Sequence, residues 1–329
     1  MVDSVNSSNG GNYETYLESW NPNYMQALEH MNITPKTTVN ISFASFNFSW
    51  GGPDYKTPIF GGMQMSAEAM KGVISYIHSK GGKVKMSLGG ANKDYYISEA
   101  MQPMNPKGIS VGNMANFIAV AMKDYGLDRI DLDLEDPSGD TAYNQSFAQS
   151  VSSMISQIKG ADPDKDISLT VKGQDWNGYT QQLIKDSLPN ISSVNFMEYD
   201  LWNAPGASYV DQIKSDLALY TGDPSTKYEG GHKGWGIPKD KIQIGLMPGK
   251  DDNGNTLTVA DAQAIASLAQ SQGYNGIMTW DLTRDYDGTG ADGDGAASMS
   301  YTNAIESALG ITEDANFQID KMQARKRPS

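Results

Sequence analysis

Three acidic side chains stand at alternate positions in the stretch DRIDLDLEDP, residues 128 to 137: Asp131, Asp133 and Glu135. Alternate residues of a β-strand point to the same face, so this spacing places the three carboxyl groups in one row. Strands disfavour aspartate, so the row needs an explanation beyond β propensity. In an enclosed space, desolvation and like-charge repulsion would raise the pKa of these carboxyl groups and keep one protonated near neutral pH. A proton on the outermost carboxyl is what general acid catalysis requires.

Other interpretations of these acids remain open. An exposed strand with a solvated acidic face has the same pattern, and clustered oxygen ligands would suit Ca²⁺ or Mg²⁺. Asp128 is out of phase with the row, so a structural hydrogen bond explains it as well as a functional role does. The Asp-rich stretches at 250–255 and 285–295 lack the spacing of a calcium-binding loop and are interpreted as solvated turns. The sequence predicts no metal and no cofactor.

The acidic strand is the fourth of eight β-rich runs that alternate with segments of helical periodicity. The predicted strands are Tyr13 to Leu17, Val39 to Phe46, Val84 to Leu88, Ile130 to Glu135, Ile167 to Val171, Val194 to Tyr199, Ile242 to Met247 and Gly276 to Asp281. Eight strand–helix units predict an α/β fold, a closed (β/α)8 TIM barrel. A doubly wound sheet is the alternative, but it usually has fewer strands.

The barrel gives the acidic row its direction. The leucines should face the surrounding helices, which turns the acids into the barrel and places Glu135 at the C-terminal mouth. Only a loop and one helix fit between the last two strands, so we expect a single domain without an inserted α+β domain. We expect residues 1–12 to be a flexible N-terminus, 13–311 to form the barrel and 312–329 to be a flexible tail.

Composition restricts the partners. The formal charge of −14 and pI near 4.6 argue against nucleic acid or an anionic membrane surface as a partner. No apolar run approaches the roughly 18 residues of a membrane span. With no cysteine, the chain has no thiol nucleophile and no disulfide. The N-terminus lacks the pattern of a signal peptide, so the chain is either cytosolic or an export product written without its leader.

Four stretches resemble one known family. DRIDLDLE resembles the D-x-x-D-x-D-x-E signature of glycoside hydrolase family 18, the chitinases and endo-β-N-acetylglucosaminidases. KMSLGG, with Ser87, Gly89 and Gly90, is similar to the S-x-G-G third strand of that family. NFMEYD resembles its M-x-Y-D sixth strand, and GIMTWD resembles its eighth strand, which ends in tryptophan. The stretches TVKGQDWN and GLMPGK, on the fifth and seventh strands, match no family pattern.

The resemblance implies a retaining, substrate-assisted mechanism in which the acetamido oxygen of the sugar attacks its own anomeric carbon. Glu135 would protonate the leaving oxygen and later activate water. Asp133 would orient the acetamide and stabilise the oxazolinium ion, while Asp131 shares its charge or proton. Tyr199 would donate a hydrogen bond to the acetamide carbonyl.

The resemblance also implies a set of substrate-binding residues. Trp280 would be the apolar floor beneath the sugar, and Asp200 would contact the sugar or tune its neighbour. The remaining predicted residues are Met197, Ser87, Gly89, Phe46 and Trp202, of which Ser87 and Gly89 shape the mouth and the two aromatic residues offer further sugar platforms. Trp20 and Trp235, which also follow strands, are further candidates for platforms.

The function implied is that of a chitinase, a monomeric, endo-acting and secreted enzyme whose substrate is chitin or chito-oligosaccharides. An endo-β-N-acetylglucosaminidase acting on the chitobiose core of N-glycans would use the same chemistry. A chitinase-like lectin is the non-catalytic alternative, although such proteins typically lose the glutamate that is present here as Glu135. A metal-dependent sugar-phosphate barrel enzyme is a third alternative.

Overall fold

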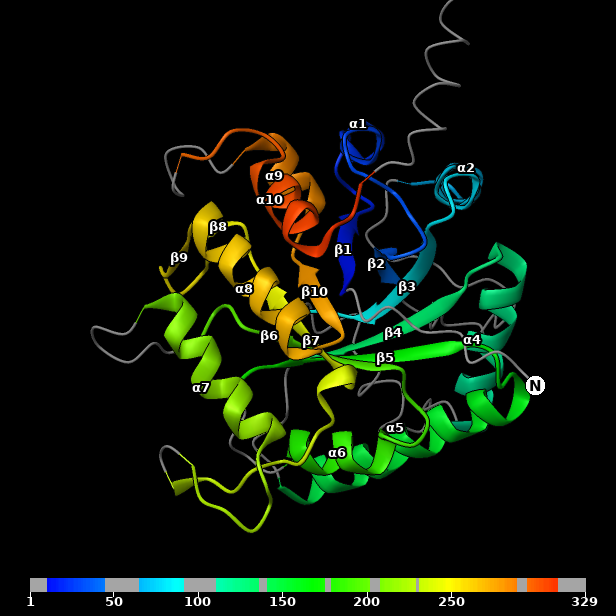
Figure 1. The fold of residues 1–329 in the computed structure, drawn as a ribbon. Helices are drawn as coiled ribbons and strands as arrows, with labels where there is room; N and C mark the ends of the chain where they lie inside the picture. Colours follow the sequence, from blue (N-terminus) through cyan, green and yellow to red (C-terminus); the bar gives the residue numbers. More distant parts are fainter. Residues whose placement is uncertain are drawn as a thin grey trace, which may run out of the picture.

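The computed structural model describes residues 11–44, 65–91, 111–135, 141–174, 179–201, 208–228, 231–288 and 295–312 (Figure 1). Eight parallel strands close into a barrel in the order β1-β10-β7-β6-β5-β4-β3-β2, so each strand lies beside its neighbours in the chain. They are β1 (Asn12–Glu18), β2 (Thr37–Ala44), β3 (Lys83–Gly89), β4 (Arg129–Leu134), β5 (Asp166–Lys172), β6 (Ser193–Met197), β7 (Ile242–Leu246) and β10 (Gly276–Thr279). The predicted (β/α)8 barrel is confirmed.

Helices surround the strands (Figure 1). They are α1 (Tyr24–Glu29), α2 (Ala67–Ser79), α4 (Val111–Tyr125), α5 (Thr141–Ala161), α6 (Tyr179–Ser187), α7 (Tyr209–Thr221), α8 (Val259–Gln272), α9 (Leu282–Asp287) and α10 (Ser300–Leu309). The caps follow local chemistry: Thr258 and Asp261 form a capping box at the start of α8, and Gly273 ends that helix in the left-handed conformation. Between β7 and β10 the chain forms only α8 and the small antiparallel pair β8 (Gly249–Lys250) and β9 (Thr256–Leu257).

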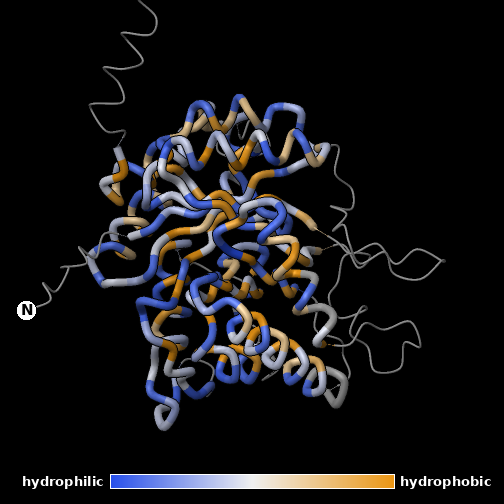
Figure 2. The backbone as a smooth tube through the Cα atoms, turned by 90° about the vertical axis from the view of Figure 1, so that its right-hand side faces the viewer, coloured by the Kyte–Doolittle hydropathy of each residue, from blue (hydrophilic) through white to orange (hydrophobic). Residues whose placement is uncertain are grey.

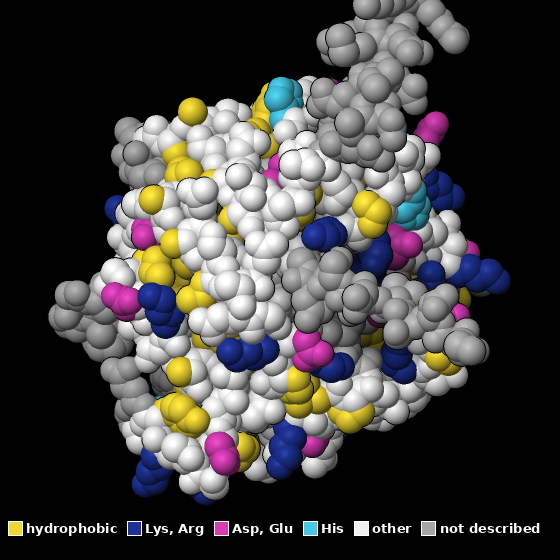
Figure 3. Space-filling view, viewed as in Figure 1, with side chains coloured by type: hydrophobic (Ala, Val, Ile, Leu, Met, Phe, Trp, Pro, Cys, Tyr) yellow, Lys and Arg dark blue, Asp and Glu magenta, His cyan; other side chains and the backbone are white. Residues whose placement is uncertain are grey.

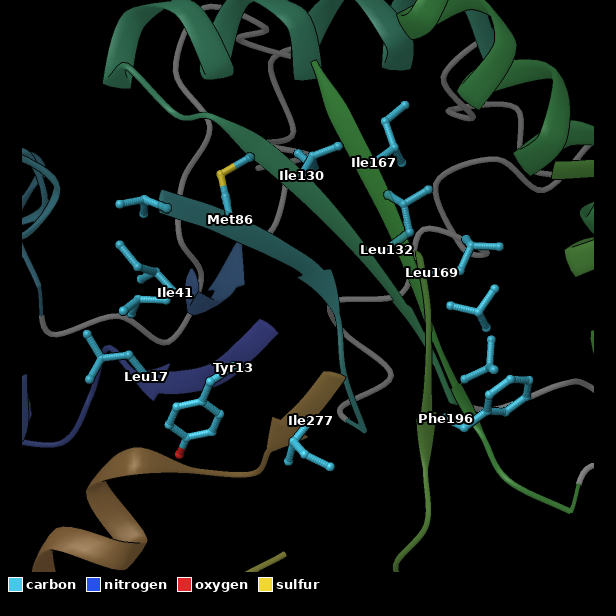
Figure 4. Close-up of a cluster of buried hydrophobic side chains, with 14 of the residues drawn as sticks. Tyr13, Leu17, Ile41, Met86, Ile130, Leu132, Ile167, Leu169, Phe196 and Ile277 are labelled. Carbon is cyan, nitrogen blue, oxygen red and sulfur yellow. The ribbon is translucent and has the colours of Figure 1, made fainter. Parts of the chain in front are cut away.

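The leucines and isoleucines of the acidic strand face outward. Ile130 and Leu132 lie in one buried cluster with Ile167 and Leu169 of the neighbouring strand (Figure 4). Hydrophobic residues recur along the strands and alternate with hydrophilic residues along the helices, as the tube in Figure 2 shows. This apolar layer between strands and helices is the core, so the opposite faces of the strands can carry the polar residues of the site.

The described surface is polar. Lys, Arg, Asp and Glu side chains are interspersed over the face seen in Figure 3. Among the described residues, Val120 is the one large hydrophobic side chain that is exposed. The described helices include none that is both long and apolar enough to cross a membrane.

Several strands end one or two residues earlier than the sequence predicted; among them, β4 ends at Leu134 and β7 at Leu246. β6 ends at Met197 and β10 at Thr279, so Tyr199 and Trp280 lie in the turns that follow. Asp200 adopts the left-handed conformation, with φ of 56°, which ends the extended run. Asp281 caps α9 by accepting a hydrogen bond from the Arg284 N–H at 3.0 Å.

Helix α9 also corrects the interpretation of residues 285–295 as a solvated turn. Asp285 is buried, and its two carboxylate oxygens accept hydrogen bonds from the backbone N–H groups of Tyr301 and Thr302, at 3.2 and 2.7 Å. It therefore joins α9 to the first turn of α10. Residues 289–294 lie outside the described part of the chain.

Candidate active site

The two acids of β4, Asp131 and Asp133, point into the barrel, and Glu135 follows the strand. Asp131 pairs in register with Ser87 and Ser168 on the flanking strands, and Asp133 pairs with Gly89 and Thr170. Asp131 and Asp133 are buried, whereas Glu135, the first residue after the strand, is half-buried. The alternative of an exposed, solvated acidic face is therefore wrong.

Asp131 accepts hydrogen bonds from four hydroxyl groups. Ser168 Oγ and Thr170 Oγ1 bond to its Oδ1 at 2.5 and 2.9 Å. Tyr16 OH and Ser87 Oγ bond to its Oδ2 at 2.7 and 2.9 Å. A carboxyl surrounded by donors is stabilised in its ionised form. Both oxygens of Asp131 are therefore satisfied by hydroxyl donors.

Asp133 has the opposite environment. Burial raises the pKa of its carboxyl well above the usual range, and the charges of Glu135 and Asp131 raise it further. Tyr16 OH lies 3.3 Å from Oδ2, and the buried Oδ1 has no hydrogen-bond partner. Asp133 thus holds a proton more readily than an ordinary aspartate does, and one of its oxygens has hydrogen-bonding capacity left for a ligand.

Two glycines of β3 allow the acidic strand to approach closely. Gly89 has φ of 116°, and a Cβ there would lie 1.9 Å from the backbone oxygen of Asp133. Gly90 donates its N–H to the same oxygen at 3.1 Å, and a Cβ on Gly90 would lie 2.7 Å from the Phe43 ring. The two glycines of the S-x-G-G stretch therefore allow β3 to pack directly against the backbone of Asp133.

Tyr199 is 7% exposed, and burial raises the pKa of its phenol well above 10, with the charges of Asp133 and Glu135 adding to the effect. It therefore stays protonated and can donate a hydrogen bond. Burial also raises the pKa of the Asp200 carboxyl, although the Asp252 N–H, 2.6 Å from Asp200 Oδ1, opposes the rise.

A clip formed by residues 251–255, between β8 and β9, holds the turn that carries Tyr199 and Asp200. Asp251 Oδ2 accepts the Asp200 N–H at 2.9 Å, and Asn253 Nδ2 donates to the Asp200 carbonyl at 2.6 Å. Asn255 Nδ2 donates to the Leu201 carbonyl and to Asp251 Oδ2, both at 3.0 Å. Asp251 is 5% exposed, so the interpretation of this stretch as a solvated turn is wrong at that residue.

Trp280 belongs to an aromatic group at the mouth. Its ring stacks on Phe43, with centroids 5.3 Å apart and planes 16° from parallel, and meets the edge of Tyr16, also at 5.3 Å. The ring centroid of Trp20 lies 6.4 Å from that of Trp280. Below this group the buried side chains of Met197, Met247 and Met278 form an apolar lining with Tyr16 and Tyr199. A sugar face could stack on such a surface.

Sequence reasoning missed Tyr16 and Phe43, which join the aromatic group to the acids. Tyr16 could have been found, because YETYLE places it in phase with Glu14 and Glu18 on β1, the same alternation as on β4. Phe43 lies near the irregular end of β2, where the pairing register with β3 shifts, so alternation gave no guide to its direction.

Several predicted residues are not brought to this site. Trp235 packs against Phe196 and Tyr220 on the outer side of the barrel, so its interpretation as a sugar platform is wrong. Phe46 and Trp202 lie outside the described residues. Asp128 has a structural role, because its Oδ2 accepts the Val84 N–H at 2.8 Å and contacts His78 Nε2 at 2.7 Å.

The described residues contain no group of three or more His, Asp and Glu side chains arranged to hold a metal ion. The two buried acids of the row are instead surrounded by hydroxyl donors and neighbouring carboxyls. The chemistry open to this arrangement is proton transfer between a half-buried and a buried carboxyl beside an aromatic floor.

The comparisons with known proteins agree with this geometry. The model of the glycosyl hydrolases family 18 matches residues 12–248. The chain belongs to that family. A search of curated protein sequences gave no match. The family 18 resemblance drawn from the four motifs is therefore confirmed over most of the barrel.

Solved structures of similar fold include active domain 2 of a chitinase from Pyrococcus furiosus, crystallised as catalytic-site mutants, with 16% identity and a TM-score of 0.67 over 92% of this chain and 97% of that one. A complex of such mutants with chito-oligosaccharides has 15% identity and a TM-score of 0.64 over 97% of both chains. A family GH18 chitinase from Chromobacterium violaceum has 20% identity and a TM-score of 0.64 over 92% of this chain and 84% of that one. At these identities the likeness concerns the fold.

Proposed function

We propose that this family 18 protein is a chitinase that cleaves β-1,4 linkages between N-acetylglucosamine residues of chitin or chito-oligosaccharides with retention of configuration. The observation that carries the proposal is the contrast within the acidic row. Asp131 is held by four hydroxyl donors, Asp133 is buried with one unpartnered oxygen, and Glu135 is half-buried at the mouth. The chito-oligosaccharide complex of the Pyrococcus furiosus protein supports this substrate class.

In the proposed reaction, Glu135 protonates the leaving glycosidic oxygen and then removes a proton from the attacking water. The acetamido group of the substrate supplies the nucleophilic oxygen. Its N–H faces the unpartnered Oδ1 of Asp133, and its carbonyl oxygen accepts the phenol proton of Tyr199. Before the bond breaks, the proton that Asp133 held without substrate passes to Glu135, and Glu135 gives this proton to the leaving oxygen. As the oxazolinium ion forms, the ionised Asp133 stabilises its positive charge.

The short connection between β7 and β10 supports internal cleavage. The connection from β7 to β10 consists of the β8–β9 pair and α8, so no additional domain rises from it to wall the groove. Trp280, stacked on Phe43, offers a flat apolar floor for the sugar that undergoes cleavage. A substrate site without such a domain beside it would admit a polysaccharide at internal linkages, which favours endo action.

Hydrolysis of chitohexaose, followed by chromatography, tests the activity, and proton NMR of the first products tests retention, for which the β-anomer is expected. Glu135→Gln should lower kcat by about 10²-fold to 10⁴-fold. Calorimetry should show that the Kd for chitohexaose changes by no more than a few-fold. Asp128→Asn is the matched control, because Asp128 belongs to the same motif but bonds only to Val84 and His78. Hydrolysis by Glu135→Gln at the wild-type rate would refute the assignment.

The same preparation separates the other functions. Release of glycans from a high-mannose glycoprotein without cleavage of chitohexaose would replace the chitin assignment by the N-glycan one. Binding of chitohexaose by the wild-type chain with no turnover would indicate a lectin. Activity abolished by a chelator would indicate the metal-dependent alternative.

A further inference from the structure

The floor of the barrel carries a buried ion pair. Lys85 of β3 and Glu14 of β1 are 0% and 1% exposed, and Lys85 Nζ lies 2.5 Å from Glu14 Oε2. Among the described lysines and arginines, Lys85 is the one that is buried. Apolar branched residues ordinarily fill a TIM barrel, and a buried ion pair carries a large desolvation penalty. The presence of an ion pair in this buried position therefore needs an explanation other than its contribution to stability.

Glu14 is satisfied within the floor. Its Oε1 accepts hydrogen bonds from Asn40 Nδ2 and Asn195 Nδ2, both at 3.2 Å, and its Oε2 accepts from Lys85. Burial raises the pKa of the Glu14 carboxyl, and the ammonium of Lys85 opposes that rise. Glu14 thus anchors Lys85, whose second hydrogen bond leads away from the pair.

That second bond leads to the acidic row. Lys85 Nζ donates to Ser168 Oγ at 2.9 Å, and Ser168 Oγ donates to Asp131 Oδ1 at 2.5 Å. An ammonium group has only donors, and a serine hydroxyl has one proton. Ser168 must therefore accept from Lys85, and its single proton is directed to Asp131. The hydrogen bonds from Lys85 through Ser168 to Asp131 can therefore run only in this direction.

A second hydroxyl is oriented in the same way. Asn195 Nδ2 donates to Thr170 Oγ1 at 3.0 Å, and Thr170 Oγ1 donates to Asp131 Oδ1 at 2.9 Å. Both oriented hydroxyls meet the same oxygen of Asp131, and Glu14 connects to both of them, through Lys85 to Ser168 and through Asn195 to Thr170.

We infer that Lys85, anchored by Glu14, is a positioning residue that keeps Asp131 ionised through Ser168, so that the mobile proton of the row stays on Asp133 and Glu135. The inference deepens the proposed function and rests on it for the roles of Asp133 and Glu135. Without the oriented proton of Ser168, Asp131 would compete for the proton that Asp133 passes to Glu135. Lys85 touches no reacting atom and acts only through Ser168 and Asp131.

The charged or titratable groups around the row come from five strands. They are Tyr16 and Glu14 on β1, Lys85 on β3, Asp133 and Glu135 beside β4, Lys172 on β5, which lowers the pKa of Asp133, and Tyr199 after β6. The other strands contribute Asn40, Gln243 and Met278, which do not titrate in this range. The ammonium of Lys85 is thus the cation connected to Asp131 by hydrogen bonds.

The direct test is a carboxyl titration by NMR with ¹³C-labelled aspartate, in which the Asp131 signal is assigned by its loss in Asp131→Asn. Ser168→Ala removes one oxygen and leaves the Glu14–Lys85 pair intact. It should move the titration of the Asp131 signal to higher pH, because a donor to the ionised form is lost, and Ser168→Thr, which restores a hydroxyl, should reverse much of the change. The double variant Lys85→Met with Glu14→Gln, which leaves no unpaired buried charge, should shift Asp131 in the same direction.

Lys241→Met is the matched control, because Lys241 is half-buried and bonds only to the carbonyl groups of Leu188 and Ile191 outside the acidic row. An unchanged Asp131 titration in both Ser168→Ala and the double variant would overturn the inference. This readout needs no turnover, so it is independent of the proposed function. In an active enzyme, the acidic limb of the kcat/KM profile should move to higher pH by a similar amount in Ser168→Ala and stay in place in Lys241→Met.

Discussion

Asp281 offers a quantitative test of the electrostatics at the barrel mouth. Its carboxyl is 2% exposed, and burial and the neighbouring charge of Glu18 raise its pKa from 3.8 to about 7. Because the folded state holds this proton more tightly than the unfolded chain, the free energy of unfolding falls as pH rises from about 4 to about 7 and then stays low. The difference of about 3 units corresponds to roughly 4 kcal/mol, shared between the two coupled acids.

Asp281→Asn removes the ionisation but keeps a good helix cap, because Asn can accept the Arg284 N–H as Asp does. We expect the variant and the wild type to unfold with similar free energies at pH 4. At pH 8 the variant should be more stable by up to about 4 kcal/mol. Urea unfolding monitored by circular dichroism at half-unit steps from pH 4 to pH 8 measures this divergence.

Two controls define the cause. Glu18→Gln removes the like charge and should flatten the same part of the stability curve. Asp223→Asn alters an exposed carboxylate whose pKa is lowered by the Ser225 N–H, so its contribution is lost as pH falls and the variant should gain nothing at pH 8. Parallel curves for wild type and Asp281→Asn across pH 4 to 8 would refute the argument that burial raises this pKa.

Three further predictions follow from single contacts. Gly89→Ala should lower the free energy of unfolding by more than about 3 kcal/mol and displace Asp133. Gly72→Ala, at an open position of α2, is the control and should raise the free energy of unfolding by about 0.5 to 1 kcal/mol. Thermal unfolding measures both changes. Asn255→Ala should open the clip on Asp200 and lower kcat/KM for chitohexaose about tenfold, mainly through kcat; unchanged kinetics would count against a positioning role for the clip. Burial raises the pKa of the Glu198 carboxyl, which is 2% exposed beside Asp216 and Tyr220, so the stability of Glu198→Gln relative to wild type should increase as pH rises in chemical unfolding.

The sequence predicted what depends on local alternation. The inward direction of Asp131 and Asp133 follows from the two-residue period of a strand, and the closed barrel follows from eight strand–helix units. Strand ends were less predictable, because they depend on contacts from elsewhere in the chain. The turn at Asp200 is held by Asp251 and Asn255, more than fifty residues away, and no local pattern reveals that connection.

The hydrogen-bond partners of the acids show where sequence reasoning reaches its limit. Ser87 was predicted from a motif, but its bond to Asp131 depends on the register between β3 and β4. Tyr16 lies on the first strand, and it reaches Asp131 and Asp133 across the closed barrel rather than along a neighbouring strand. Such contacts exist only once the barrel has closed.

Barrel closure also explains why one row of acids can contain members with different proton affinities. Alternation alone makes Asp131 and Asp133 equivalent, because both lie on the same face of one strand. The interior distinguishes them by depth: Asp131 meets oriented hydroxyls from three other strands, whereas Asp133 lies higher, between two like charges and with one oxygen unpartnered. The different surroundings of Asp131 and Asp133 therefore arise from the tertiary structure, and a substitution on the barrel floor can alter them without changing any of the three acids.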